Sequence, residues 1–465
     1  MSYSPHLRTA VLLSGSGTAG AYHAGVLRAL HEAGIKVDVM SGRGVGVVGA
    51  LFSAIDAAPK TWEENGLWRR RPVVRLYRWR RSLRAAAGCL VAAAAILALP
   101  LLVLATGLIA YPLSFLVQMI SVDAGHRLAT SYAGLIARAF GRSALPMIIP
   151  RLVTLVITGA FIALAVAALK PSGRNRRQAG HRTHGPWWRR LVGAPWSAEP
   201  GLQHFQGSLW QLFRGPARAK APTASDLSRR YRELLADNLG QPGFRELIVT
   251  TLDLETRSDL VFAMLGEQHR QTFFHRGQHH DGQNRGPERS GDLIDLVAVG
   301  RSQVLDALAG ALSLPVLTEP HPIAFSPESY WKGETHRSCD RPAAVERLLH
   351  ELAVAGVEQV IVASASADRS EPHRLNRPLG TLESRLSEHL SAAEASAIRD
   401  GIATQAGRFQ GIFLIQPGYN PVGPFDCDGV YDERSDRFQT LEELVDRGYE
   451  DAYRQFIEPV VGAGE

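Results

Sequence analysis

The chain has 465 residues, of which 45% are hydrophobic and 21% are charged, and it contains three cysteines. This composition excludes collagen-like, coiled-coil and wholly disordered proteins. The cysteines have no C-x-x-C spacing, which excludes a disulfide scaffold and a Cys/His zinc pattern, so we expect a reducing compartment. The formal net charge is +6, and the basic excess is concentrated at residues 69–84 and 170–190. These two stretches border the most apolar part of the chain.

The first sixty residues alternate apolar runs with helical patterns. Residues 9–14 (TAVLLS) and 37–40 predict short buried strands, and residues 21–33 and 45–55 predict helices. A glycine-rich turn follows each of the two strands. This alternation predicts the start of a mainly parallel α/β sheet.

Two further stretches are long and apolar enough to cross a membrane. Residues 85–122 and 152–169 contain no charged side chain, and roughly 20 apolar residues span ~30 Å of hydrocarbon. We therefore expect a transmembrane hairpin at residues 85–169, with spans at about 88–110 and 149–169 and a short loop between them. Pro100 and Pro112 are expected to kink or end the first span.

The charges beside the hairpin predict its orientation. Eight arginines lie within residues 69–84 and seven basic residues within 170–190, whereas the loop between the spans holds only Arg127, Arg138 and Arg142. The positive-inside rule then places both outer flanks in the cytoplasm. We expect a two-span protein of the cell (inner) membrane, with both termini and the folded domain cytoplasmic. The bilayer is the expected partner, and no nucleic acid is expected.

The hairpin interrupts one predicted domain. Residues 1–60 form its first part, residues 170–224 are a basic linker rich in Arg, Gly, Pro and Trp, and residues 225–465 form the remainder. We expect Ser225 to cap a helix that ends at residue 238. Further strands are expected at 246–254, 260–265, 359–363 and 412–415, and further helices near 293–312, 342–354, 382–405 and 441–456.

A histidine-rich stretch lies within the hydrophilic residues 266–291. It contains His269, His275, His279 and His280, next to Asp281. Histidines spaced four apart can chelate a metal on a helix, but Gly277 and the polar neighbours favour a solvated loop. We expect no metal site and no cofactor.

The first glycine-rich turn has the pattern G-x-G-x-x-G, formed by Gly15, Ser16, Gly17, Thr18, Ala19 and Gly20. Such a turn at a helix N-terminus binds either a dinucleotide pyrophosphate or the oxyanion of an acyl-transfer reaction. A dinucleotide site needs an acidic residue at the end of the second strand, and Asp38 falls too early for it.

The second glycine-rich turn consists of Gly42, Arg43, Gly44, Val45 and Gly46. It follows a strand and has the spacing of the nucleophile elbow G-x-S-x-G of hydrolases. A dinucleotide-binding fold does not require this second turn. The pair of turns therefore favours a hydrolase-type site.

The sequence around both turns, LLSGSGTAGAYHAGVLRALHEAGIKVDVMSGRGVGVVGALFSAI, resembles the opening of the patatin-like phospholipase family. The resemblance is close over residues 9–57. It is looser at TLDLETRSDLVFAML, AGALSLP, VEQVIVAS and QPGYNPVGPFDCD. It implies a three-layer α/β/α fold and, in active members, lipid acyl hydrolysis by a Ser–Asp dyad without histidine.

The catalytic motifs of this family are degenerate here. Gly44 stands where the nucleophilic serine belongs, and glycine has no side-chain nucleophile. Ser41 and Ser53 flank the turn but are not at its apex. The family's D-G-[GA] turn has two candidate counterparts: Asp340, which could instead be a helix N-cap, and Asp428, which could instead lie in a surface turn. Ala19 replaces the basic residue of the first loop.

Together these features favour a membrane-anchored patatin-like protein of lipid metabolism that is a pseudoenzyme. The backbone amides of the first loop, within Gly15–Gly20, are expected to bind a lipid or acyl group. An active acyl hydrolase with a non-standard nucleophile is the alternative. A dinucleotide-dependent oxidoreductase is the distant alternative.

Overall fold

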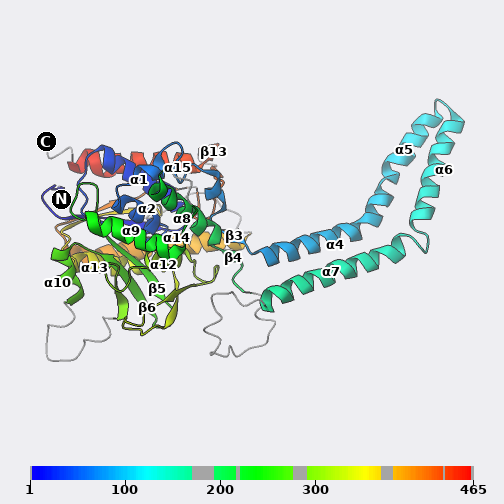
Figure 1. Cartoon of the computed structure of the whole chain (residues 1–465). Helices are drawn as coiled ribbons and strands as arrows, with labels where there is room; N and C mark the ends of the chain where they lie inside the picture. The colour runs from blue at the N-terminus through cyan, green and yellow to red at the C-terminus, as the bar shows by residue number, and fades with distance from the viewer. Residues whose placement is uncertain are drawn as a thin grey trace. The chain divides into compact units, whose positions relative to one another are not determined.

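The computed structural model describes residues 3–169, 193–215, 220–275, 291–367, 381–420, 422–432 and 435–461. The chain divides into two compact units: Met1–Arg78 with Trp196–Glu465, and Trp79–Pro195. The first unit contains the glycine-rich turns (Figure 1). It extends past residue 60, the predicted end of the first part of the domain.

The first unit is built on one sheet whose strand order is β11-β10-β1-β2-β5-β6-β7, with β8 and β9 branching from β5. Five adjacent strands run parallel, as predicted: β11 (Gly411–Ile415), β10 (Gln359–Ser364), β1 (Thr9–Gly15), β2 (Val39–Gly44) and β5 (Glu246–Asp253). The remaining strands at this side are β6 (Ser258–Met264), β7 (Leu293–Asp295), β8 (His321–Ala324) and β9 (Thr335–Cys339). β6 and β9 are antiparallel to β5, a feature that the sequence pattern did not indicate.

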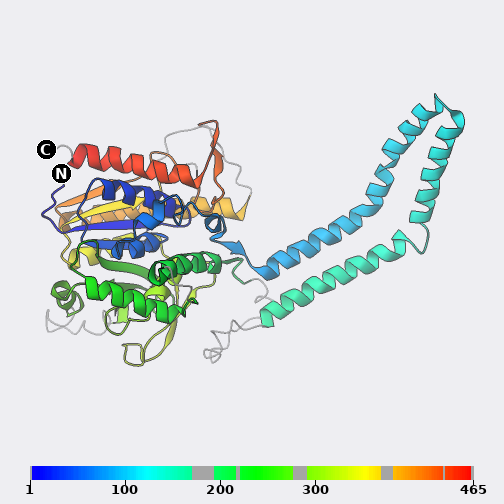
Figure 2. The ribbon, with the colours of Figure 1, turned by 45° about the horizontal axis from the view of Figure 1, so that its top comes forward.

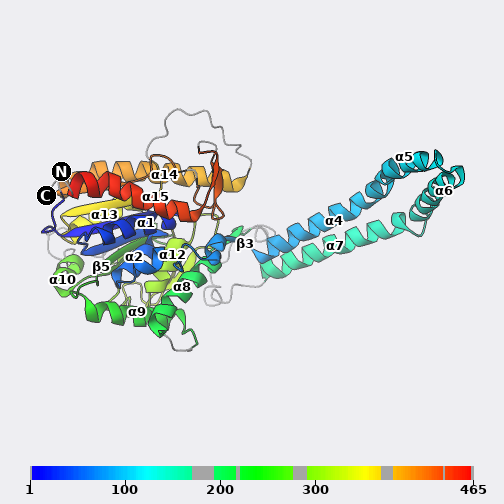
Figure 3. The ribbon, with the colours of Figure 1, turned by 90° about the horizontal axis from the view of Figure 1, so that it is seen from above.

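Helices cover both faces of the sheet. The side chains of each strand alternate between these faces, and both faces carry apolar side chains that the helices bury. Val11 and Leu13 of β1 enter one apolar cluster, and Ala10 and Leu12 enter the other. The first cluster includes α1 (Ala19–Glu32), α2 (Gly46–Ala54), α8 (Glu199–Arg214), α9 (Ala224–Asn238), α12 (Val304–Leu312) and α15 (Leu441–Ala452). The second includes α10 (Glu267–His275), α13 (Ala344–Val354) and α14 (Leu382–Gln405). Figures 2 and 3 show α1 and α15 side by side over the sheet, and the fold is the predicted three-layer α/β/α arrangement.

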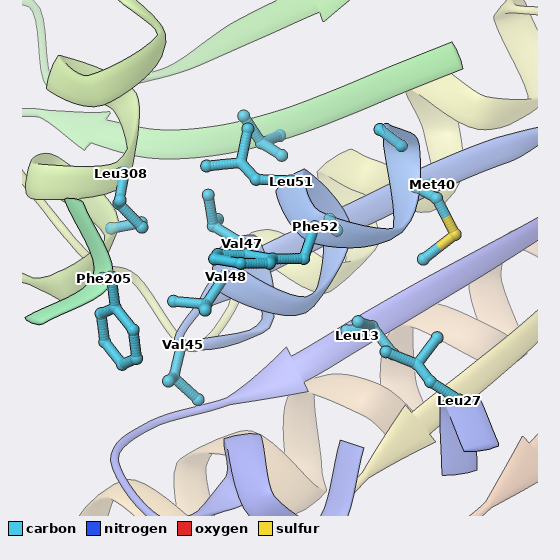
Figure 4. Close-up of a cluster of buried hydrophobic side chains, with 14 of the residues drawn as sticks. Leu13, Leu27, Met40, Val45, Val47, Val48, Leu51, Phe52, Phe205 and Leu308 are labelled. Atoms are coloured by element: carbon cyan, nitrogen blue, oxygen red, sulfur yellow. The ribbon is translucent and has the colours of Figure 1, made fainter. Parts of the chain in front are cut away.

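The sequence interpretation of residues 170–224 as a linker is wrong for part of this stretch. Residues 199–214 form the amphipathic helix α8, whose Phe205 and Leu209 are each 1% exposed. Phe205 lies in the same cluster as Val45, Val48 and the side chains of α12 (Figure 4). The abundance of Arg, Gly and Pro around this helix concealed its apolar spacing.

Other predicted boundaries also shift. The N-cap of α9 is Thr223, whose hydroxyl accepts a hydrogen bond from the Asp226 amide, and not Ser225. Residues 267–275 form helix α10 where a loop was expected, residues 293–295 form strand β7 where a helix was expected, and α15 continues as a π-helix over Tyr453–Val461. Minor elements are α3 (Pro59–Trp62), the 3-10 helices Arg71–Arg75 and Ala406–Arg408, and the short strands β3 (Arg78–Trp79), β4 (Trp196–Ser197), β12 (Val430–Asp432) and β13 (Arg437–Gln439).

The second unit is a helical hairpin. α4 (Arg81–Ala105) packs against α7 (Leu145–Leu169), and α5 (Gly107–Gln118) packs against α6 (Val122–Ala139). By length and composition, Arg81–Gln118 and Leu145–Val166 are long and apolar enough to cross a membrane. The predicted first span at 88–110 runs past the end of α4, and the expected short loop contains the 18-residue helix α6.

Candidate functional site

The two glycine-rich turns lie next to each other because β1 and β2 are parallel neighbours. In the register of this pair, Gly15 at the end of β1 is opposite Gly44 at the end of β2. Helices α1 and α2 begin directly after these strands. The fold thus brings both predicted turns together at the carboxyl ends of the parallel strands. Ligand sites of parallel α/β sheets form at this edge.

Gly44 adopts the left-handed backbone conformation of an elbow residue, with φ of 56°. A Cβ atom at this position would lie 2.2 Å from the Gly15 carbonyl oxygen and 3.1 Å from Oδ2 of Asp340. Real Cβ atoms do not approach a backbone oxygen so closely. Position 44 therefore favours glycine for two reasons: its φ is positive, and there is no space for a Cβ atom.

Asp340 is the candidate aspartate that the fold brings to the elbow. It follows β9, is 2% exposed, and its Oδ2 atom lies 3.3 Å from Nη2 of Arg43. The hydroxyl of Ser16 also donates to Oδ2, at 3.4 Å. The interpretation of Asp340 as a helix N-cap is wrong, because α13 begins at Ala344 and has Ala343 as its N-cap residue.

A second buried carboxylate completes this cluster. Nη2 of Arg43 lies 3.7 Å from Oε2 of Glu394, which projects from α14 and is 5% exposed. Oε1 of Glu394 accepts hydrogen bonds from the hydroxyls of Ser14 at 3.0 Å and Ser364 at 3.1 Å. Nη2 of Arg43 also donates to the Ser16 hydroxyl at 3.2 Å.

In this cluster one cation, Arg43, lies between two buried carboxylates, those of Asp340 and Glu394. Burial raises the pKa of the Asp340 carboxyl, and the charge of Glu394 raises it further, while Arg43 and the Ser16 hydrogen bond oppose the shift. Removing one partner of a buried ion pair leaves the other charge uncompensated, which typically lowers the free energy of unfolding by about 3–5 kcal/mol. Both buried carboxylates therefore depend on the charge of Arg43.

Two backbone amides of the glycine-rich turns, those of Thr18 and Val45, donate to carbonyl groups of the chain itself. The Thr18 amide donates to the Pro424 carbonyl at 3.0 Å, and the Thr18 hydroxyl donates to the Gly423 carbonyl at 3.0 Å. The Val45 amide, which follows the elbow residue, donates to the Gly15 carbonyl at 2.9 Å. A carbonyl oxygen therefore takes the place next to Thr18 that an acyl oxygen would need.

An aromatic cluster lies beside this carbonyl. Phe425 packs edge-on against Tyr77, with ring centres 5.7 Å apart, and against Trp196, with ring centres 5.0 Å apart. The Tyr77 hydroxyl donates to the Leu312 carbonyl at 3.0 Å. Burial raises the pKa of Tyr77, and the nearby Asp340 carboxylate raises it further. We call the segment Val422–Cys427 with these two aromatic residues the plug.

The other predicted candidates lie elsewhere. Asp428 is exposed and comes after the plug. Asp38 precedes β2 and its carboxylate accepts the Thr9 amide at 2.9 Å, so it lies at the opposite end of the strands from the glycine turns and argues against dinucleotide binding. His269 bonds to Glu246 at 3.1 Å, whereas His279, His280 and Asp281 lie outside the described residues.

Sequence reasoning missed several members of the cluster. Glu394, Ser14 and Ser364 come from three elements that are distant in the chain, and nothing in their local patterns marks them as partners. Ser16 was predicted only as part of the anion-binding loop. The buried arginine had one signal, since Arg43 is a charged residue within an otherwise apolar strand-turn-helix.

Comparison with known proteins finds a similarity in the segment that contains the two glycine-rich turns. Residues 11–98 match the family model described as patatin-like phospholipase. This segment is similar to patatin-like phospholipases. The match contains both glycine-rich turns and Gly44, and it confirms the resemblance that those turns predict.

Curated relatives match over a shorter stretch. Patatin-like phospholipase domain-containing protein 6 of Homo sapiens and that of Mus musculus are each 40% identical over 60 residues, which is 13% of this chain and 4% of theirs. A solved structure, VipD from Legionella pneumophila, is 13% identical with a TM-score of 0.31, and the alignment covers 99% of this chain and 67% of that one. That score is too low to support an argument about the site.

Proposed function

We propose that this chain is a membrane-anchored patatin-like protein of lipid metabolism whose domain has lost acyl hydrolysis and acts as a pseudoenzyme. One observation carries the proposal. Where the dyad needs a serine beside the aspartate, the elbow offers Gly44, and the carboxylate of Asp340 is ion-paired to Arg43. Without a nucleophile, general-base and oxyanion groups cannot form an acyl-enzyme.

The nature of the remaining site supports binding rather than turnover. In this proposal the acyl group binds at the Thr18 amide, which Pro424 now occupies, so it would enter only if Pro424 and Phe425 moved away. Displacement would free the Thr18 amide and expose an apolar wall of aromatic side chains. We therefore propose a fatty acyl ligand that competes with the plug.

A second candidate function rests on Ser16. Its hydroxyl lies 3.4 Å from Asp340, a serine–carboxylate pair in the same cluster. However, Ser16 is 5% exposed and receives a hydrogen bond from Arg43, which lowers the nucleophilicity of its oxygen. An active hydrolase would have to use this residue after the cluster opens.

A covalent probe tests both candidates. The purified full chain, in detergent and in phosphatidylglycerol-containing vesicles, is treated with a fluorophosphonate that labels activated serines, next to an active patatin-like hydrolase. We expect no labelling and no release of fatty acid. Stoichiometric labelling that disappears in Ser16→Ala would establish the second candidate and overturn the pseudoenzyme.

We further propose that the two candidate spans anchor the chain in the inner membrane with the patatin-like domain in the cytoplasm. The arginines at residues 69–84 support this orientation. Vesicle flotation with alkaline carbonate washing tests the anchoring. Release of the full chain by the wash would contradict it, whereas a variant lacking residues 81–169 should be released.

A further inference from the structure

The helical hairpin is much longer than a bilayer is thick. The apolar helical stretch Arg81–Gln118 has 38 residues, which corresponds to about 57 Å at 1.5 Å per residue. The hydrocarbon layer is ~30 Å thick. α4, with 25 residues, spans about 37 Å and is sufficient alone, so α5 and α6 need a different environment.

Both arms of the hairpin are interrupted near the end of α4, where the Tyr132 hydroxyl of α6 donates to the Leu104 carbonyl at 3.1 Å. α4 ends at Ala105 and α5 begins at Gly107, while α6 ends at Ala139 and α7 begins at Leu145. Within this unit, α5 and α6 turn away together from the line of α4 and α7 (Figures 1 and 2). Arg138 and Arg142 lie at this bend, where the spanning pair α4–α7 reaches its far end.

The two distal helices differ in polarity. α5 is apolar on all sides, and its Leu108, Ile109 and Phe115 are 80%, 71% and 61% exposed. α6 is amphipathic: Gly125 and Tyr132 contact α5, whereas Arg127, Ser131 and Arg138 fall on the opposite face at about 100° per residue. The Tyr132 ring packs edge-on against Tyr111 of α5, with ring centres 5.3 Å apart.

We infer that α5 and α6 form an interfacial hairpin that lies along the bilayer surface remote from the patatin-like domain, with α5 beneath α6. In this arrangement the hydrocarbon covers the exposed apolar side chains of α5. Arg127 and Arg138, on the face of α6 that also carries Asp123, meet lipid phosphates, to which the two guanidinium charges are complementary. The tyrosine pair lies at the level where aromatic side chains are enriched. This inference rests on the membrane anchoring proposed above.

Depth measurements test the inference on the full chain. Single cysteines are introduced in a Cys89→Ala background, since Cys339 and Cys427 are buried, and are labelled with bimane in vesicles of phosphatidylcholine and phosphatidylglycerol. Phospholipids brominated at known positions report the depth of each label. Reference sites in α4 are Leu90, Leu97 and Leu101, and test sites near α5 are Leu108, Leu116 and Ile120, all exposed.

The expected depths differ between the two sets. The α4 labels should change depth by about 16 Å from residue 90 to residue 101, whereas the three test labels should be quenched at one shallow depth in the far leaflet. A depth gradient that continues through residue 120, or test labels without any quenching, would overturn the inference. Absence of quenching at α4 as well would instead defeat the membrane anchoring on which it rests.

A second measurement reports the orientation of α6. Ser131→Cys places a thiol on the arginine face, and its matched control Ile136→Cys places one on the face toward α5. A membrane-impermeant maleimide added to the side remote from the domain should modify the first at least ten times faster. Equal rates would contradict the placement of α5 beneath α6.

Discussion

The guanidinium of Arg43 lies 3.3 Å from the carboxylate of Asp340, and neither side chain is more than 2% exposed. Arg43 immediately precedes Gly44, so the glycine at the apex of the turn lies next to a cation that is ion-paired to the buried carboxylate. The pairing links the degenerate elbow to the stability of the fold.

Replacing Arg43 by methionine should destabilise the protein strongly. The carboxylates of Asp340 and Glu394 would then stay buried without a cation, and we expect a loss of about 3–5 kcal/mol in the free energy of unfolding. Urea unfolding of the full chain in detergent measures it. Arg28→Met, which breaks an exposed pair with Glu32, is the control and should cost less than about 1 kcal/mol. Equal losses in the two variants would contradict the role of the cluster.

Replacing Gly44 by serine should not create a hydrolase. The new Cβ would meet the Gly15 carbonyl oxygen, so we expect no fluorophosphonate labelling and a loss in stability. Gly34→Ala is the matched control, because Gly34 also has a positive φ, of 65°, but a Cβ there would have no atom within 4 Å. Gly34→Ala measures the backbone cost of a positive φ alone, about 1–2 kcal/mol. A third variant, Gly44→Ala, adds the contact with the Gly15 carbonyl oxygen and should lose more stability than Gly34→Ala. Ester hydrolysis by Gly44→Ser would show that the elbow can still accept a nucleophile.

The pH dependence of stability should contain a contribution from His23. Burial, together with the nearby charge of Arg43, lowers its pKa from 6.5 to about 4, although the hydrogen bond to the Ser14 carbonyl opposes the shift. The unfolded chain therefore binds an additional proton between about pH 6.5 and pH 4, and the free energy of unfolding falls as the pH falls through this window, by about 3 kcal/mol. His23→Gln keeps a donor toward the Ser14 carbonyl, which His23 Nε2 contacts at 2.9 Å, but does not titrate. Identical pH slopes for the two proteins would contradict this assignment.

Replacing Phe425 by alanine should loosen the plug. The variant loses the edge-on contacts to Tyr77 and Trp196, and the Thr18 amide should then exchange its hydrogen at least tenfold faster. Fluorescent palmitate should bind the variant more tightly than the wild type if the plug covers the acyl position. Phe438→Ala, at an exposed phenylalanine of β13, is the control and should change neither measurement. Unchanged exchange in Phe425→Ala would contradict the proposed competition.

Much of the fold follows from the sequence because parallel strands and their helices have local signatures. The apolar runs at β1, β10 and β11 and the helices α1, α2 and α14 lie where the patterns predicted them, within a few residues. The antiparallel strands β8 and β9 escaped detection, since Thr335–Cys339 (THRSC) carries no apolar run. This strand pairs with its neighbour in sequence, β8, and with the distant strand β5.

The sequence by itself determined the two glycine-rich turns, the glycine at position 44 and the presence of long apolar helices, because each is a property of neighbouring residues. Only the tertiary structure decided that Asp340 lies at the elbow, that Glu394 shares Arg43 with it, and that Pro424 bonds the Thr18 amide. Those contacts join residues hundreds of positions apart. Their distances depend on how the strands and helices pack, which no local pattern records.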